Sequence, residues 1–126
     1  MKYLSKSQIR KLHADLIASS GGLSGLRDEG LLDSAIATPL QGFSGADLYP
    51  TIIDKATQLA FGLIRNHPFI DGNKRIGTHA MLVLLYLNEI ELAYEDDELI
   101  QIILNVAAGQ TSRDDLYQWI KTHITE

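Results

Sequence analysis

Two long helical patterns separated by a short break constrain the fold of this chain more than any other feature. The first covers residues 51–66, and the second covers about residues 72–88. Pro68 favours an extended conformation at His67, so the first helix is predicted to end just before them. From Ala80 onward the second pattern is apolar on nearly every side, which is typical of a buried helix. We therefore predict a helix–loop–helix unit with a buried central helix.

Apolar periodicity, capping residues and breakers predict further helices on both sides of this unit. These helices cover residues 5–20, 28–38, 96–108 and 112–123. Residues 41–50 lack a helical period, so we predict a long loop, and loops of this length are often functional. Residues 90–94 are expected to form a short strand that pairs with residues 2–4. The predicted fold is an all-α bundle of about six helices with little or no β-sheet, in a single domain spanning residues 1–126.

Composition limits the kind of partner that the chain can have. It has 126 residues, of which 45% are hydrophobic, and a net charge of -5. The acidic balance disfavours a sequence-specific DNA binder, so we expect no direct DNA binding. The longest apolar run, residues 80–87, is too short to span a bilayer, and residues 1–8 lack the apolar core of a signal peptide. With no cysteine in the chain, these features lead us to expect a cytoplasmic protein without a membrane partner.

The start of the central helix breaks a local rule of helix stability. Helix N-termini favour acidic residues, as the predicted helices at residues 96 and 112 have, whereas this one carries Asn73, Lys74 and Arg75. Asp71 is the predicted N-cap, and Gly72 allows a ligand to approach the backbone closely. Free N–H groups, the helix dipole and two cations would then point at one place. This combination predicts an anion site that suits phosphate.

Two residues beside this anion site are predicted to serve as a general base and a metal ligand. His67 has an ordinary pKa suited to a general base, and Asp71 is a hard oxygen ligand of the kind that Mg²⁺ prefers. Each residue also has a structural explanation: a loop histidine, an N-cap aspartate, an Asn73 that bonds its own turn, or a solvated Lys74. Phe69 is predicted to be a buried anchor. Together these residues predict nucleotide-dependent transfer to a hydroxyl group.

The residues of this loop resemble the Fic/Doc family. The family signature reads His-x-Phe-x-Asp/Glu-Gly-Asn-Gly-Arg-x-x-Arg, and the segment HPFIDGNKR, residues 67–75, follows it. The matching positions are His67, Phe69, Asp71, Gly72, Asn73 and Arg75. Residues 21–36 are also similar to the Doc branch, so the resemblance covers the whole chain. It implies an all-helical Fic/Doc-type fold.

Two departures from the signature favour the Doc branch. Lys74 replaces a glycine, and Thr78 replaces the second arginine. The resemblance to Doc toxins implies transfer of the γ-phosphate of ATP to a threonine of elongation factor Tu, which stops translation. It implies His67 as the base, Asp71 as the Mg²⁺ ligand, and a phosphate site made of Gly72, Asn73, Lys74 and Arg75. An AMP-transferase and a non-catalytic protein-binding module are the alternatives, and the roles of Arg65 and His79 stay open.

The resemblance also implies a partner. The inhibitory helix of many Fic proteins ends in Glu-Gly, as Glu29 and Gly30 do, but Gly25 lies where that helix has serine or threonine. Inhibition is therefore expected from a separate antitoxin, Phd-like or other, whose flexible tail folds into a groove of the toxin. Residues 41–50 are expected to correspond to the family's flap, which aligns the target beside the site.

Overall fold

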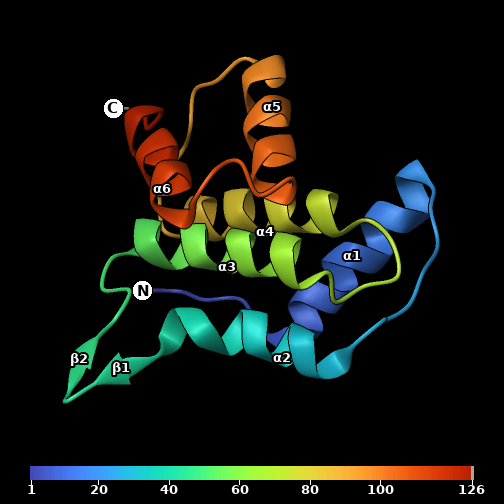
Figure 1. Cartoon of the computed structure of the whole chain (residues 1–126), viewed down its shortest axis with the longest axis horizontal. Coiled ribbons are helices and arrows are strands. Elements are labelled where there is room, and N and C mark those ends of the chain that lie inside the picture. Colours follow the sequence, from blue (N-terminus) through green and yellow to red (C-terminus); the bar gives the residue numbers. More distant parts are fainter. Residues whose placement is uncertain (126) are drawn as a thin grey trace.

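The fold is built from six α-helices and one small hairpin, as a computed structural model that describes residues 1–125 shows (Figure 1). The helices are α1 (Lys6–Ser20), α2 (Glu29–Ala37), α3 (Ile52–Asn66), α4 (Asn73–Leu87), α5 (Asp96–Ala107) and α6 (Arg113–Thr122). A 3-10 turn, η1 (Thr38–Leu40), precedes strands β1 (Gly42–Phe43) and β2 (Ala46–Asp47). The prediction of an all-α fold with about six helices is confirmed.

Helices α3 and α4 form the centre of the molecule. They run antiparallel, with α2 along one side, α5 and α6 on the other, and α1 crossing near the loop that joins them (Figure 1). On α4, the side chains of Ile76, Ala80, Met81 and Leu84 are fully buried, as predicted for a central helix. A Cβ atom on Gly77 would lie 2.6 Å from Ile64 Cγ1. This glycine therefore allows the two helices to approach closely near the loop.

Side chains cap the predicted helices that begin near residues 5, 51 and 112. Ser5 and Gln8 form a capping box at the start of α1, and the Ser112 side chain accepts a hydrogen bond from the Asp115 N–H at the start of α6. Thr51 and Asp54 form a capping box on α3. These local bonds satisfy N–H groups that have no partner within the helix. They explain why the predicted boundaries differ from the observed ones by so few residues.

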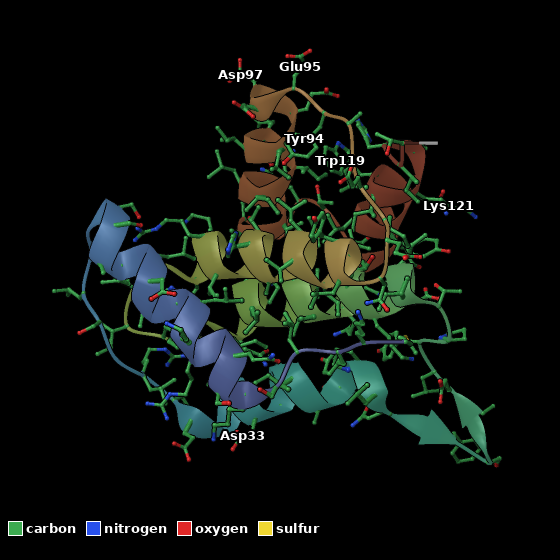
Figure 2. The ribbon with its side chains drawn as sticks, turned by 180° about the vertical axis from the view of Figure 1, so that it is seen from behind. Asp33, Tyr94, Glu95, Asp97, Trp119 and Lys121 are labelled. Atoms are coloured by element: carbon green, nitrogen blue, oxygen red, sulfur yellow. The ribbon has the colours of Figure 1, made fainter. Side chains whose placement is uncertain are left out.

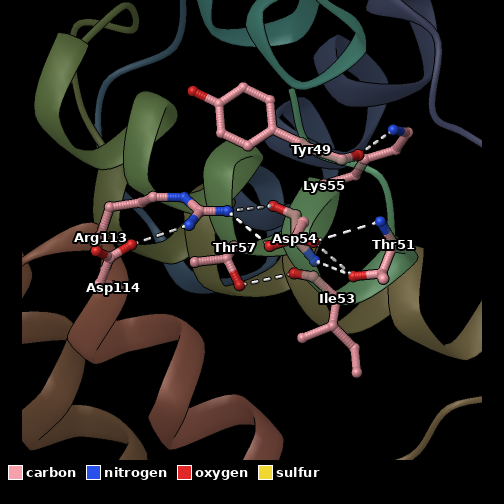
Figure 3. Close-up of polar contacts among 8 residues, drawn as sticks. All are labelled: Tyr49, Thr51, Ile53, Asp54, Lys55, Thr57, Arg113 and Asp114. Atoms are coloured by element: carbon pink, nitrogen blue, oxygen red, sulfur yellow. Dashed lines mark hydrogen bonds and ion pairs between the residues drawn. The ribbon is translucent and has the colours of Figure 1, made fainter. Parts of the chain in front are cut away.

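A polar cluster joins the N-terminal ends of α3 and α6 (Figure 3). Arg113 Nη2 lies 3.1 Å from Asp54 Oδ1, and the Arg113 guanidinium lies 5.0 Å from the centre of the Tyr49 ring. The Lys55 side chain is almost fully buried and donates to the Tyr49 carbonyl. Burial raises the pKa of Asp54, but hydrogen bonds from Thr51 and Arg113 outweigh it, so the pKa lies below its ordinary value.

The predicted loop, residues 41–50, contains a small hairpin at residues 42–47. Gly42 pairs with Asp47 and Phe43 with Ala46. Ser44 and Gly45 between the strands both have positive φ angles, 52° and 81°, as a tight two-residue hairpin turn requires. Strands of two residues are too short to show an alternating pattern.

The position of the hairpin corrects a second expectation. It lies at the N-terminal end of α3, whereas residues 67–72 follow the C-terminal end (Figure 1). A helix of 15 residues is about 22 Å long, so the hairpin is remote from the loop. The expectation that residues 41–50 lie over the site as a flap is therefore wrong.

Residues 90–94 pair with the C-terminal segment and not with residues 2–4 as predicted. Leu92 and Ile124 form an antiparallel bridge. The N-terminal segment bonds a side chain instead, because the Lys2 N–H donates to Asn88 Oδ1 at 2.8 Å. Tyr94 then packs toward Trp119 on α6, with ring centres 6.2 Å apart (Figure 2). Within residues 1–125 no helix combines the length and apolar character that a bilayer crossing requires.

Candidate functional site

The loop between α3 and α4, residues 67–72, is held by the segment that precedes α2. Phe69 forms an antiparallel bridge with Leu26. The Ile70 N–H donates to the Gly25 carbonyl at 3.0 Å, and the Pro68 carbonyl accepts hydrogen bonds from two backbone N–H groups of residues 27–28 at 2.7 and 3.0 Å. Backbone bonds of this kind fix the course of a loop independently of its side chains. The loop is therefore a rigid platform.

His67 presents its imidazole to solvent from a fixed backbone. The residue ends α3 in a left-handed conformation (φ 54°, ψ 52°), which is uncommon for a residue other than glycine. The Arg27 guanidinium holds this turn, because Nε donates to the His67 carbonyl at 2.6 Å and Nη2 to the Asn66 carbonyl at 2.9 Å. The exposed ring forms no hydrogen bond with any residue of the described chain, 1–125. The backbone of His67 is therefore held in place, while its imidazole has no hydrogen-bond partner among residues 1–125.

Phe69 and Asn73 close the loop from inside. Phe69 is 2% exposed, which confirms the predicted anchor. The buried Asn73 side chain accepts from the Phe69 N–H at 2.9 Å and donates to the Phe69 carbonyl at 3.0 Å. One amide hydrogen of Asn73 remains for a ligand. Asn73 therefore bonds its own turn, and its first role is to hold the loop.

The Asp71 carboxylate accepts two backbone hydrogen bonds. Oδ1 accepts from the Gly72 N–H at 2.8 Å, and Oδ2 accepts from the Leu23 N–H at 3.1 Å. These two hydrogen bonds hold the pKa of the Asp71 carboxyl below its ordinary value, and the bond from Leu23 has the larger effect. The carboxylate is therefore ionised at neutral pH.

The predicted N-cap role of Asp71 is wrong. Gly72 is the N-cap of α4, with φ 77°, and no side chain among residues 1–125 caps this helix. The Asp71 carboxylate bonds its neighbour's N–H and Leu23 instead of reaching the N–H groups of the first turn. The start of α4 consequently keeps N–H groups open to a ligand.

The two cations of the first turn have different surroundings. Lys74 is exposed and forms no ion pair within the described residues, 1–125. Arg75 Nη1 donates to Ser20 Oγ at 2.6 Å and to the Gly21 carbonyl at 2.8 Å, and Arg75 Nη2 lies 4.0 Å from Asp71 Oδ1. Arg75 therefore ties the end of α1 to α4, whereas Lys74 is free to meet a ligand.

Arg65 brings a third cation to the same place from α3. Its Nη1 donates to the carbonyls of Val106 and Ala107, at 3.3 and 3.2 Å. These carbonyls belong to the end of α5, where a cation is stabilised by the helix dipole. This contact accounts for the position of Arg65, which the sequence left open.

These residues surround one open cavity of about 400 Å³. Its lining residues are Ile64, Arg65, His67, Asp71, Gly72, Asn73, Lys74, Arg75 and Ala107. The volume falls within the range of small-molecule sites. All six predicted site residues therefore lie together, around a cavity whose cations suit an anionic ligand.

The donor set fits a magnesium ion that is shared with a ligand. Within residues 1–125 no group of three or more His, Cys, Asp or Glu residues could hold a metal. Asp71 is the acidic residue of the cavity lining, its side chain is 45% exposed, and each of its oxygens accepts one hydrogen bond from residues 1–125. Mg²⁺ commonly binds through one or two carboxylates plus the phosphates of a nucleotide.

Contacts from α1 and the segment after it were not predicted from the sequence. His13 is buried and stacks on Phe69, and Arg27 and Leu23 bond the loop. A single polar residue on the apolar face of α1 is the one signal that could have identified His13. Leu23 acts through its backbone, so its identity carries no signal.

A second, largely apolar groove adjoins the cavity and shares Lys74 and Arg75 with it. This α1–α4–α5 groove has a volume of about 410 Å³. It is lined by Leu16, Lys74, Arg75, Thr78, His79, Leu82, Leu99, Ile100, Ile103 and Leu104. Ile100 and Leu104 are 57% and 46% exposed. Exposed apolar side chains along a groove mark an interaction surface.

Comparison with known proteins gives one family match and two relatives, and all three carry the name Doc. Residues 3–85 match the model of the Fic/DOC family. The chain is 42% identical over 96 residues to "Toxin Doc" of Mycolicibacterium smegmatis, which covers 76% of this chain and 72% of that protein. It is 27% identical over 112 residues to "Protein kinase doc" of Escherichia phage P1, covering 89% of this chain and 87% of the phage protein.

Proposed function

The chain belongs to the Fic/DOC family, and from this premise we propose that it is a Doc-type toxin that transfers the γ-phosphate of ATP to a threonine or serine hydroxyl. The target would be a translation factor, for which the resemblance suggests elongation factor Tu, and the transfer would arrest translation in the cytoplasm. One observation carries the proposal: the same cavity is lined by an ionised carboxylate and, as far as residues 1–125 show, by an imidazole without a hydrogen bond, a helix start without a side-chain cap and a lysine without an ion pair.

The nucleotide phosphates would bind at the start of α4. The open N–H groups of the first turn and the Lys74 ammonium supply positive charge there. Arg75 keeps donors beyond those that bond Ser20 and Gly21, and Arg65 adds charge from the opposite wall. Asp71 would hold Mg²⁺ jointly with phosphate oxygens, and the ion when bound would neutralise charge on the transferred group.

His67 would act as the general base. Its imidazole would accept the proton of the target hydroxyl as the new bond forms between that oxygen and the γ-phosphorus. The bond from the γ-phosphorus to the bridging oxygen breaks, and ADP leaves with the electron pair. The exposed ring and the rigid turn held by Arg27 suit this task, because a base must meet a hydroxyl that arrives from outside.

Thr78 supports γ-phosphate transfer over AMP transfer. The AMP-transferases of the family have an arginine at this position, which helps to present the α-phosphate. Here Thr78 Oγ1 donates to the Lys74 carbonyl at 2.8 Å, so its hydroxyl is engaged by its own helix and carries no charge. The name of the phage relative, a protein kinase, agrees with this reading.

Labelled ATP tests the proposal. Purified translation factors are incubated with the protein, Mg²⁺ and ATP labelled at the γ- or the α-phosphate, with His67→Ala as the inactive control. We expect label from the γ-position only, on threonine or serine. Label from the α-position would establish an AMP-transferase instead, and no label on any target would favour the non-catalytic binding module.

We propose the α1–α4–α5 groove as the docking surface of the antitoxin. Its apolar walls suit an amphipathic segment, and the exposed Ile100 and Leu104 would become buried on binding. Lys74 and Arg75 at one end would pair with an acidic residue of that segment.

A matched pair of substitutions tests this assignment. Ile100→Asp should weaken the complex with the cognate antitoxin by about 2–4 kcal/mol, as expected for an apolar anchor. Phe43→Asp on the remote hairpin, where the side chain is 76% exposed, should leave it unchanged. Equal affinities of the two variants would place the antitoxin elsewhere.

A further inference from the structure

His13 makes an unusual pair of contacts beneath the site. It lies on the apolar face of α1 and is 3% exposed. Its ring stacks on Phe69 with 3.7 Å between ring centres and 10° between the ring planes. Its Nε2 lies 2.7 Å from the Asp71 carbonyl oxygen. A carbonyl only accepts hydrogen bonds, so Nε2 carries the hydrogen.

An apolar side chain would fill the same space. A leucine or phenylalanine at position 13 would pack on Phe69 without the free energy that burying a polar ring requires. What histidine adds is the hydrogen bond to Asp71, which joins α1 to the main chain of the carboxylate residue. His13 therefore holds the main chain of Asp71 in addition to filling space in the core.

Helix α1 and the turn that follows it form hydrogen bonds to Asp71 at two points. His13 holds the carbonyl from below, and the Leu23 N–H holds carboxylate oxygen Oδ2 at 3.1 Å. Gly72, which follows Asp71, packs against the same imidazole, because a Cβ atom there would lie 3.5 Å from His13 Nε2. Two fixed points on one residue set the direction in which its carboxylate faces the cavity.

We propose that His13 is a positioning residue that orients the Asp71 carboxylate for the metal ion. This inference rests on the proposed function, in which Asp71 holds Mg²⁺ beside the phosphates. His13 itself touches neither nucleotide nor target. Its effect is transmitted through the Asp71 main chain.

Two substitutions separate the hydrogen bond from the stacking. H13F keeps an aromatic ring on Phe69 and removes the donor, whereas H13Q keeps an N–H donor and removes the ring stack. Leu116→Ala in α6, a fully buried position outside the cavity lining, provides a destabilised control. All variants are compared at temperatures equally far below their melting points.

The first measurement needs no nucleotide. Exchange of the Leu23 amide hydrogen, followed by NMR, reports whether the Asp71 carboxylate stays in place. We expect H13F to speed this exchange by about tenfold, as loss of one hydrogen bond in the pair would allow. H13Q should stay within about twofold of the wild type. Unchanged exchange in H13F, or an equal change in Leu116→Ala, overturns the proposal.

The second measurement concerns the metal ion. Binding of Mn²⁺ in the presence of ATP is followed by electron paramagnetic resonance, and we expect H13F to weaken it about fivefold to tenfold while H13Q preserves it. If the wild type binds no Mn²⁺ with ATP, the proposed function fails. The Leu23 exchange then still decides whether His13 orients Asp71.

Discussion

At the scale of single residues, His67 carries the clearest prediction. Its ring makes no hydrogen bond within residues 1–125, so removing it should leave the melting temperature nearly unchanged. His67→Asn is the better probe than alanine, because asparagine tolerates the left-handed backbone at φ 54°. Transfer should fall by about a hundredfold to ten-thousandfold, the usual contribution of a general base. Full activity of His67→Asn in the label assay would eliminate the proposed base.

Lys74 and Arg75 look alike in sequence, and the structure separates them. Removal of either cation from a helix start should be neutral or stabilising by about 0.3–1 kcal/mol if the helix dipole alone acts. This holds for the exposed Lys74. Arg75 bonds Ser20 and the Gly21 carbonyl, so Arg75→Ala should instead destabilise by about 1–3 kcal/mol.

Chemical denaturation of the two variants checks this difference, and ATP binding is measured alongside. Both variants should bind ATP more weakly, but only Arg75→Ala should unfold at lower denaturant concentration. Equal stabilities of the two variants would mean that the hydrogen bonds from Arg75 to Ser20 and Gly21 contribute nothing to the free energy of unfolding.

At the scale of elements, the turn after α1 provides a matched pair of glycines. Both Gly21 and Gly22 have positive φ, 87° and 116°, so an alanine at either position is strained by about 1–3 kcal/mol. A Cβ atom on Gly22 would also lie 2.7 Å from Asp71 Oδ2 and 2.9 Å from Arg75 Nη2, whereas one on Gly21 meets nothing within 4 Å. Gly22→Ala should therefore reduce transfer severalfold more than Gly21→Ala at similar stability. Parallel kinetics and melting curves test this, and equal activities would contradict the contact.

The junction of α3 and α6 predicts a pH dependence. Because the pKa of Asp54 is lowered from 3.8 in the folded state, the unfolded state binds more protons at pH values between the two pKa values. The stabilisation is thus fully present above about pH 4–5 and is lost as the pH falls through the folded pKa. Asp54→Asn should lower the melting temperature at pH 7, and its difference from the wild type should shrink as the pH falls below 3.8. A difference in melting temperature that stays the same at every pH would show that the ionised Asp54 carboxylate is not linked to folding.

At the scale of the whole molecule, the sequence predicted what depends on local rules. The helices and the gathering of His67 to Arg75 follow from periodicity and from one short loop. Contacts between distant segments could not be predicted from the sequence. Examples are the hydrogen bond from His13 to the Asp71 carbonyl and that from the Leu23 N–H to the Asp71 carboxylate. The hairpin was missed for a related reason, because its two-residue strands are stabilised by a turn and show no pattern.

The cavity and the groove share Lys74 and Arg75, so the proposed nucleotide site and the proposed antitoxin surface would be coupled. Two ligands that draw on the same cations oppose each other, and thermodynamic reciprocity makes the opposition mutual. ATP should weaken the hold of the antitoxin by the same factor by which the antitoxin weakens ATP binding. Titration calorimetry of the antitoxin with and without saturating ATP measures that factor, and a ratio of one would show independent sites. The energy state of the cell would then set how firmly the toxin is restrained.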